Sequence, residues 1–334
     1  MTIRENLEQW ERINLSEYAT LSMNSKGRLK EEEQCDIRPV FQRDRDRIIH
    51  SKSFRRLKDK TQVFLTPEGD HYRTRLTHTL EVSQNARTIA KALKLNEELV
   101  EAIALGHDLG HTPFGHAGER ALNRICPFGF THTEQSLRTV DLLEKDGQGL
   151  NLTYEVRDGI LNHQTSGHPA TLEGKVVRLS DKIAYIHHDM DDAIRGGIIS
   201  DADVPLEIGE VIGYSLGERL DHFIHDIVIT SMGTGDVTMS KEVAEAMSRM
   251  RQFMFDNVYT NPAAKSEEGK AEALVETLFT HFCEHKDDLP TDFKLLLDRG
   301  EPLERVVCDY IAGMTDRYAI NVYEEIYIPR SWHG

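Results

Sequence analysis

Apolar residues recur along this chain with the spacing of α-helices, whereas the alternation typical of β-strands is scarce. After Asn96, a residue type that often caps the start of a helix, Leu99, Ala102 and Ile103 mark one helical face that leads to Gly106. Comparable patterns predict helices at residues 42–57, 73–93, 131–145, 153–163, 173–195, 215–232, 240–258, 266–284 and 302–324. The pattern favours an all-α fold, a bundle of helices rather than a protein built on a sheet.

The bulk composition is that of a folded chain. Of 334 residues, 39% are hydrophobic and 29% are charged. Residues 1–334 are expected to form a single mainly helical domain, because no Pro-rich or Gly/Ser-rich linker divides them. No apolar run resembles a membrane span or a secretory signal, and the 4 cysteines lie far apart. We therefore expect a soluble cytoplasmic protein with reduced thiols.

Charge is unevenly distributed. The formal net charge of -16 argues against nonspecific binding of nucleic acid, because contact with a phosphate backbone needs concentrated positive charge. Residues 43–60 are an exception, with eight lysines and arginines against three aspartates. Two interpretations of this stretch stay open: a solvated helix face, or a wall that binds anions.

The segment from Gly106 to Glu119 concentrates groups that bind metals or transfer protons. It holds three histidines, two carboxylates and four glycines in fourteen residues. Glycines weaken a helix by about 1 kcal/mol each relative to alanine, so their density predicts backbone that approaches a ligand or metal closely. His107 and Asp108 are neighbours in the sequence and reach one ion only from the end of a helix, which Gly106 and Gly110 favour.

A second His-Asp pair, His188-Asp189, stands within a continuous helical pattern. On that helix Asp181, Tyr185 and Asp189 recur every four residues and share one face. Burying two carboxylates and a phenol against an apolar core is costly unless partners satisfy them. The row therefore indicates either a polar cavity or a solvated helix face.

These residues resemble a known family. His78, the pair His107-Asp108 and Asp181 match the H…HD…D pattern of the HD-domain superfamily. The segments at 54–64, 106–119 and 313–319 resemble its deoxyguanosinetriphosphate triphosphohydrolase (dGTPase)-like branch. The resemblance spans about residues 36 to 330 and implies an HD-domain helical bundle. Its HD core would lie at about 36–200, with additional C-terminal helices at about 201–334.

The resemblance implies that His78, His107, Asp108 and Asp181 bind one divalent metal ion. Two imidazoles and two carboxylates favour Mn²⁺, Fe²⁺, Co²⁺ or Ni²⁺ over Mg²⁺, which prefers oxygen ligands and retains its waters. Mn²⁺ is the first choice, and the other four ions are alternatives.

Proton transfer is expected from residues nearby in the sequence. His116 and Glu119 meet as an i, i+3 pair if Gly115 starts a helix, and a carboxylate raises the proton affinity of an imidazole. The alternative is a helix cap and a surface carboxylate. His111 and His132 are similar to family histidines that line the phosphate or assist catalysis.

Substrate contacts are also implied by the resemblance. Arg75 and Lys182 would hold a triphosphate, with a planar fork and a point charge respectively. Tyr185 and Asp189 would bind the sugar 3′-hydroxyl and crowd the 2′ position, which favours deoxyribose. Gln62 is a further candidate for contact with the sugar or base.

The expected activity is hydrolysis of a deoxynucleoside triphosphate (dNTP), dGTP or a broader set, to deoxynucleoside and inorganic triphosphate. The alternatives are another HD phosphohydrolase, such as a 5′-deoxynucleotidase or phosphodiesterase, and a catalytically silent nucleotide sensor. The family also implies a homo-oligomer, a tetramer or hexamer, and a dNTP effector at a second site. No membrane partner is expected, and the net charge does not support a nucleic-acid partner.

Overall fold

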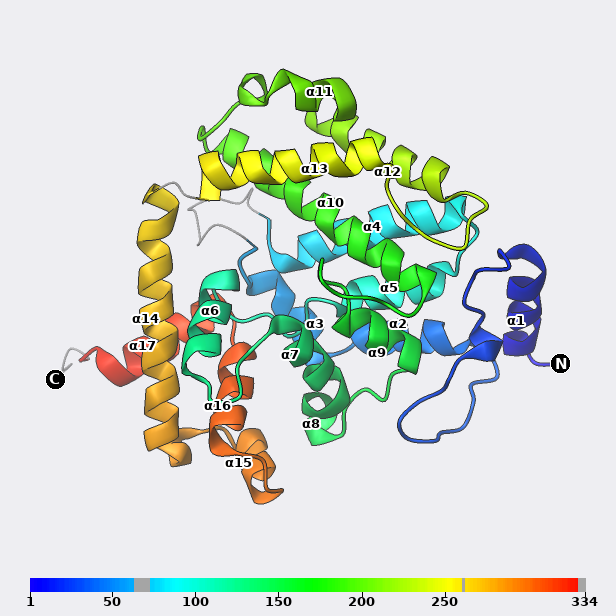
Figure 1. Ribbon diagram of the computed structural model, residues 1–334. Helices are drawn as coiled ribbons and strands as arrows, with labels where there is room; N and C mark the ends of the chain where they lie inside the picture. The colour runs from blue at the N-terminus through cyan, green and yellow to red at the C-terminus, as the bar shows by residue number, and fades with distance from the viewer. Residues whose placement is uncertain (63–72, 260–261, 330–334) are drawn as a thin grey trace. The chain divides into compact units, whose positions relative to one another are not determined.

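The computed structural model describes residues 1–62, 73–259 and 262–329 of the chain. Within these ranges the regular elements are helices, and extended pairing occurs only as isolated bridges such as Arg28 with Thr153 (Figure 1). The predicted all-α fold class is confirmed. Among the described residues, no helix is both long enough and apolar enough to cross a membrane.

The chain divides into two compact units made of discontinuous segments. Unit 1 consists of Met1–His50, Thr77–His107 and Leu150–Pro262, and unit 2 consists of Ser51–Leu76, Asp108–Gly149 and Ala263–Gly334. The chain passes from one unit to the other between His107 and Asp108. One mainly helical domain, with an HD core at about 36–200 and a C-terminal helical part at about 201–334, stays a prediction.

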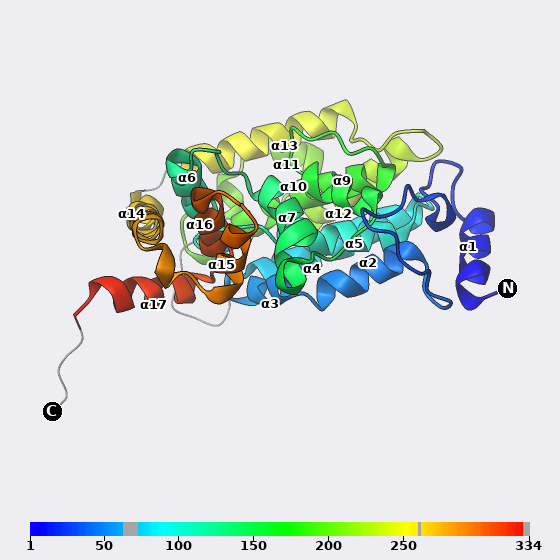
Figure 2. The same ribbon diagram turned by 90° about the horizontal axis from the view of Figure 1, so that it is seen from below.

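Unit 1 is organised around helix α5 (Glu97–Gly106), which packs against α2 (Val40–Ile49), α9 (Tyr154–Leu161) and α10 (Leu172–Arg195) (Figure 2). Asn96 caps α5 by accepting hydrogen bonds from the backbone N–H groups of Glu98 and Leu99, as the sequence predicts. A Cβ on Gly106 would lie 2.6 Å from Ile160 Cδ1. Glycine therefore lets α5 and α9 approach closely.

The other helices of unit 1 extend this bundle, and α10 packs against both α12 and α13. Helix α4 begins at Arg75 in unit 2 and continues into unit 1. The remaining elements are α1 (Ile3–Asn14), η1 (Ser22–Asn24), α4 (Arg75–Ala92), η4 (Asp201–Asp203), α11 (Leu206–Ile212), α12 (Leu216–Ser231), α13 (Lys241–Met254) and η5 (Phe255–Tyr259).

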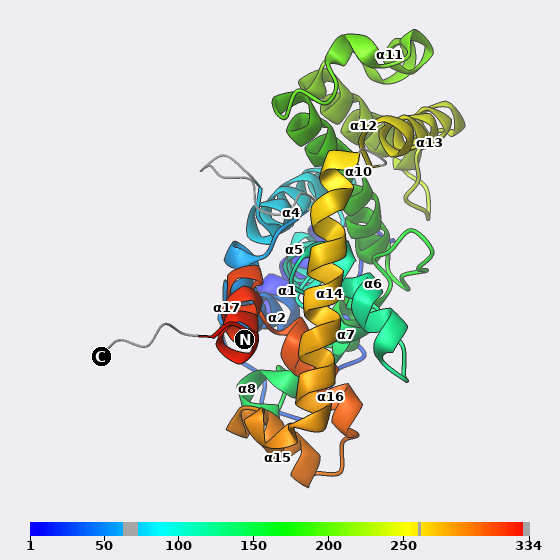
Figure 3. The same cartoon turned by 90° about the vertical axis from the view of Figure 1, so that its left-hand side faces the viewer.

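Unit 2 has its own apolar core. The core includes Leu122 of α6 (Gly115–Ile125), Val275 and Leu278 of α14 (Pro262–Glu284), and Val307 of α16 (Leu303–Ala312). Figure 3 shows α14 as one long helix in this unit. The remaining elements are α3 (Lys52–Arg56), η2 (Leu57–Asp59), α7 (His132–Arg138), η3 (Thr139–Leu143), α8 (Glu144–Gly147), η6 (Lys286–Asp288), α15 (Thr291–Asp298) and α17 (Asp316–Tyr327).

Two segments that were predicted as single helices each form two helices in the structure. The segment 42–57 is split into α2 and α3, because Ser51 caps a new helix by accepting from Phe54 N at 3.1 Å. The segment 302–324 is split into α16 and α17, and Thr315 caps the second helix. Helical periodicity continues across both breaks, whereas the caps decide where each helix begins.

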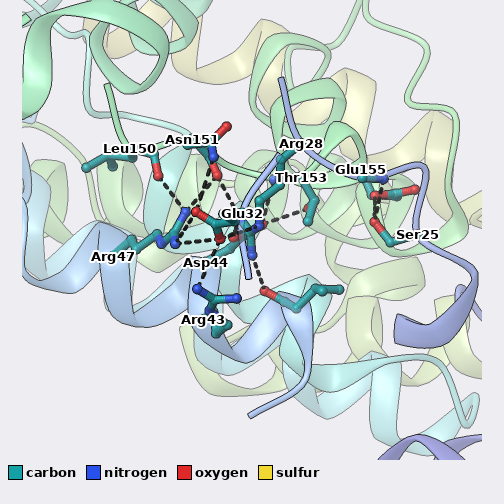
Figure 4. A network of polar contacts seen from close by, with 12 residues as sticks. Ser25, Arg28, Glu32, Arg43, Asp44, Arg47, Leu150, Asn151, Thr153 and Glu155 are labelled. Carbon is teal, nitrogen blue, oxygen red and sulfur yellow. Dashed lines mark hydrogen bonds and ion pairs between the residues drawn. The ribbon is translucent and has the colours of Figure 1, made fainter. Parts of the chain in front are cut away.

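The first part of the basic stretch is paired with carboxylates in unit 1 (Figure 4). Arg43 and Arg47 contact Glu32 at 3.1 and 2.7 Å, and Arg45 contacts Glu98 at 2.8 Å. Buried Asp44 pairs with Arg28 and accepts from Thr153 N at 2.8 Å. The interpretation of residues 43–60 as an anion-binding wall is therefore wrong for Arg43, Arg45 and Arg47, because carboxylates of the chain already pair with their charges.

Candidate active site

In unit 1, three residues predicted to bind metal converge from three helices. His78 lies on α4, His107 follows the end of α5, and Asp181 lies on α10. Asp181 Oδ1 is 3.1 Å from His78 Nε2 and 3.7 Å from His107 Nε2. The last turn of α5 thus directs His107 toward a carboxylate from a segment distant in the sequence.

Backbone carbonyls fix the orientation of two histidines here. His107 Nδ1 donates to Ala104 O at 2.6 Å, and His163 Nδ1 donates to Ile160 O at 2.7 Å. Each Nε2 therefore carries the lone pair, the arrangement that metal-binding histidines adopt. One ligand atom each from His107, His163 and Asp181 lies within 4.8 Å of the others. His163 was missed by sequence reasoning, since an isolated histidine carries no signal of its own.

His188 was given no role from the sequence. Its Nδ1 lies 3.2 Å from His78 Nδ1, and its Nε2 contacts the Glu81 carboxylate. Glu81, His188 and His78 thus form a chain of polar contacts that ends near Asp181. The signal was available, because His188 follows Asp181 by seven residues, about two helical turns.

The electrostatics of Asp181 favour its charged form. Burial alone would raise its pKa, but the hydrogen bond with His78 and interactions with His107 and His163 lower the pKa to about 2. Asp181 is thus an anionic oxygen donor beside imidazole nitrogens. Such a mixed donor set fits a divalent ion of the first transition series, with Mn²⁺ among the candidates. The residues of unit 1 therefore fit the expected kind of metal site.

In unit 2, Asp108 lies among basic groups. Its Oδ2 accepts from Arg75 Nη1 at 2.9 Å, and its Oδ1 is 3.3 Å from His111 Nε2. The His111 ring stacks on that of His132, with centroids 3.9 Å apart. Burial, followed by the charges of Arg75 and His132, lowers the pKa of His111 well below its ordinary value. His111 is therefore neutral at pH 7.

Glu119 connects two histidines of unit 2. Its carboxylate lies 3.1 Å from His116 Nδ1 and 2.9 Å from His132 Nδ1, and it accepts from His132 N at 2.8 Å. Burial opposes its charge, but the hydrogen bonds from both histidines hold the pKa of Glu119 well below its ordinary value. Of the three side chains, only His116 is exposed, so His116 can contact a molecule that binds from solution. The arrangement can hold and move a proton at His116 Nε2.

The loop before α6 is strained. Phe114 and Gly115 have φ values of 62° and 55°, and the left-handed region is unusual for a bulky residue such as phenylalanine. Asp316 holds the loop by accepting from Phe114 N at 2.9 Å and from Thr61 N at 3.0 Å. Buried Lys60 donates to the His111 and Ala312 carbonyls. The loop sets where His116 begins its helix.

Two glycines of this segment serve protein packing. A Cβ on Gly110 would lie 2.1 Å from Ser136 N, and one on Gly118 would lie 2.1 Å from Pro113 O. The interpretation that these glycines bring backbone close to a ligand is therefore wrong for them. Dense packing of one backbone on another produces the same residue choice.

The candidate substrate residues fall in both units. Arg75 Nη2 donates to Gln62 O at 3.3 Å in unit 2, whereas Lys182, Tyr185 and Asp189 lie on α10 in unit 1. Burial and the charges of Arg251 and Arg178 lower the pKa of Lys182. Tyr259, which sequence reasoning missed, donates to Asp189. Burial is the main cause that raises the pKa of Asp189 to about 7.

Comparisons with known proteins agree with this architecture. The HD domain family model matches residues 75–186, and the phosphohydrolase-associated domain model matches residues 237–325. A phosphohydrolase of known structure from Bacteroides thetaiotaomicron has the same fold, with a TM-score of 0.52 at 18% identity over 84% of this chain and 67% of that chain. The two family models place the chain in the class of HD-domain proteins that also carry a phosphohydrolase-associated domain.

Relatives narrow the class. A deoxyguanosinetriphosphate triphosphohydrolase-like protein of Caldanaerobacter subterraneus subsp. tengcongensis is 58% identical over 99% of this chain and 98% of its own length. A protein of the same description from Clostridium perfringens strain 13 is 50% identical, with 99% of each chain covered. The chain belongs to this deoxyguanosinetriphosphate triphosphohydrolase-like family.

Proposed function

We propose that the protein hydrolyses deoxynucleoside triphosphates, dGTP or a broader set, to deoxynucleoside and inorganic triphosphate. Water attacks the α-phosphorus, the bond from phosphorus to the 5′-oxygen breaks, and a proton passes to that oxygen. The observation that carries the proposal is the convergence of His78, His107 and Asp181 in a mixed nitrogen and oxygen donor set.

One divalent ion, with Mn²⁺ favoured, would be held by His78, His107, Asp108 and Asp181. The first two and Asp181 lie together in unit 1, and Asp108 follows His107 directly in the chain. When bound, such an ion acts as a Lewis acid that neutralises charge on phosphate oxygens. His188 and Glu81 would position His78 without binding the ion.

His116 would handle the proton that reaches the 5′-oxygen. Glu119 orients His116 and shares its carboxylate with His132. His111, stacked on His132 and neutral at pH 7, would donate to or accept from a phosphate oxygen. Its Nδ1 is buried and makes no hydrogen bond with the residues that the structure describes.

Arg75 and Lys182 would bind the triphosphate. Arg251 and Arg178 each repel the charge of Lys182 in unit 1, and an anionic ligand would relieve this repulsion. Tyr185 and Asp189 would contact the sugar, because Asp189 Oδ1 is buried without a hydrogen-bond partner among the described residues. Gln62, whose Oε1 likewise lacks such a partner there, is proposed to contact the sugar or base.

Product identity tests this function. The full chain is incubated with Mn²⁺ and each dNTP in ¹⁸O-labelled water, and products are separated by chromatography and mass spectrometry. We expect deoxynucleoside and a triphosphate that carries the label. A labelled deoxynucleoside, formation of dNDP and orthophosphate, or turnover of dNMP alone would reject the proposed reaction.

Replacing Glu119 with glutamine tests the proposed proton transfer. Glu119→Gln keeps a similar size but removes the anionic acceptor that orients His116 and His132. We expect kcat to fall by about 10² to 10⁴ fold, the usual contribution of general acid-base catalysis, with little change in KM. The exposed Glu134→Gln on α7 is the matched control and should keep full activity. An unchanged kcat in Glu119→Gln would contradict this role.

We also propose that the chain assembles as a homotetramer or homohexamer and that a dNTP binds it as an effector. Both proposals rest on the family resemblance. Size-exclusion chromatography with light scattering, with and without dGTP, measures the assembly. A monomer under both conditions would reject it.

A further inference from the structure

A cavity of about 360 Å³ lies within unit 2. Its walls come from α3, α7, η3, α8, α15, α16 and α17, from the segment between α16 and α17, and from Leu109 and Gly110. The volume falls in the range of about 300 to 1,000 Å³ that is usual for small-molecule sites. None of the residues proposed for metal, proton transfer or substrate lines it.

Arg56, the last residue of α3, lines this cavity. Its Nε is buried, and its guanidinium makes no hydrogen bond or ion pair with any residue in the described ranges. Burial lowers the pKa of Arg56 and opposes its charge. The charge of Glu144, which also lines the cavity, offsets this shift only in part. A partly buried guanidinium without a hydrogen bond or ion pair is therefore costly, since its lost hydration is not fully compensated.

Four carboxylates line the cavity: Glu144 and Asp309 are buried and bound by other groups, whereas Asp146 and Asp292 are exposed to solvent. Glu144 accepts from the backbone N–H groups of Lys52 and Ser53 at 3.0 and 2.7 Å. Asp309 accepts from Gln135 Nε2 and from Arg138 Nε, both at 2.9 Å. The guanidinium of Arg56 therefore remains available to an anion from outside the chain.

The rest of the wall is largely apolar and aromatic. The rings of Phe293 and Tyr310 have centroids 5.0 Å apart, and the Tyr310 hydroxyl lies 3.2 Å from that of Tyr318. Leu143 and Met314 add aliphatic surface. Such walls favour the body of an organic molecule over a bare inorganic ion.

We propose that this cavity is a second ligand site, which binds a small aromatic anion. A carboxylate or phosphate group accepts hydrogen bonds from the planar guanidinium fork of Arg56. The aromatic body packs between Phe293, Tyr310 and Leu143. The site is independent of the proposed dNTP hydrolysis and uses none of its residues.

Binding is tested by ¹⁹F NMR on the full chain with two probes, 4-fluorophenyl phosphate and 4-fluorobenzoate, each titrated with protein. At least one probe should bind, and the two titrations distinguish a phosphate from a carboxylate ligand. Arg56→Met should weaken binding about tenfold or more, because the ligand loses its hydrogen bonds to a charged group. The matched control is Arg55→Met, which removes an adjacent exposed arginine that does not line the cavity. The control should bind as the natural chain does.

Two further measurements separate ligand binding from a structural role. Without ligand, Arg56→Met should unfold at the same or a higher temperature, because it removes an unpaired partly buried charge. Leu143→Trp, which fills the cavity and keeps Arg56, should also weaken binding about tenfold or more. The proposal is overturned if neither probe binds at 10 mM, about the weakest affinity of interest. It is equally overturned if Arg56→Met and Leu143→Trp both bind as tightly as Arg55→Met.

Discussion

His188 contacts His78, which is itself proposed to bind the metal ion. Partners of this kind set the orientation and basicity of a metal-binding imidazole, and their loss typically lowers metal affinity by about 10 to 100 fold. His188→Ala should therefore weaken Mn²⁺ binding by that factor while leaving His78, His107 and Asp181 in the chain. Mn²⁺ titration followed by electron paramagnetic resonance measures the affinity. The neighbouring His187→Ala is the control, and equal affinities in the two variants would contradict the role of His188.

Asp189 gives the protein a pH-dependent stability. Its pKa is raised from 3.8 to about 7, mainly by burial, so the folded chain holds this proton more tightly than the unfolded chain. The stabilisation is fully present below pH 3.8 and is lost as pH rises through about 7. Between pH 5.5 and 8.5, Asp189→Asn should therefore lose less free energy of unfolding than the natural chain, as urea titration measures. Asp191→Asn, on the same helix, should follow the natural chain, and parallel curves for all three proteins would refute the assignment.

At the scale of elements, the loop between α5 and α6 depends on contacts that no local pattern encodes. Asp316, two hundred residues away in the sequence, accepts from Phe114 N. Lys60 donates to carbonyls at both His111 and Ala312. The pairing of His116 with Glu119 required a helix that starts at Gly115, and α6 begins there. Only the fold supplies the partners that stabilise the left-handed residues before it.

Glycine substitutions separate packing from helix propensity. Gly110→Ala would place a Cβ 2.1 Å from Ser136 N, so the backbone must shift, and we expect a loss of about 1 to 3 kcal/mol, as for other overpacked sites. Gly269→Ala on α14 meets nothing within 4 Å and should instead add up to about 1 kcal/mol. Thermal unfolding of both variants measures the contrast. A neutral Gly110→Ala would mean that this backbone contact is looser than the structure indicates.

At the scale of the whole molecule, a bound ion should stabilise the folded chain. A ligand that binds only the folded state, at 100 times its Kd, raises the free energy of unfolding by about 2.7 kcal/mol. We expect Mn²⁺ to raise the unfolding temperature, EDTA to reverse the shift, and Asp181→Asn to abolish it. Scanning calorimetry at matched protein concentration measures each case. A full Mn²⁺ shift in Asp181→Asn, with Asp191→Asn as control, would place the ion elsewhere.

Much of this protein could be predicted from the sequence, because the relevant information is local. Helical periodicity identified the fold class, Asn96 marked the start of α5, and spacing placed Asp181, Tyr185 and Asp189 on one helix. His78, His107 and Asp181 were chosen by resemblance, and the structure brings them together. Their roles stay predictions.

The tertiary structure decided what local patterns do not contain. It placed His163 and His188 beside the proposed metal ligands, and it brought Tyr259 to Asp189. It also paired the arginines of α2 with carboxylates and left Arg56 without a hydrogen bond or ion pair among the described residues. The physical reason is that periodicity and caps depend on neighbours within a few residues. Charge pairing and cavities instead depend on side chains brought together from distant parts of the sequence.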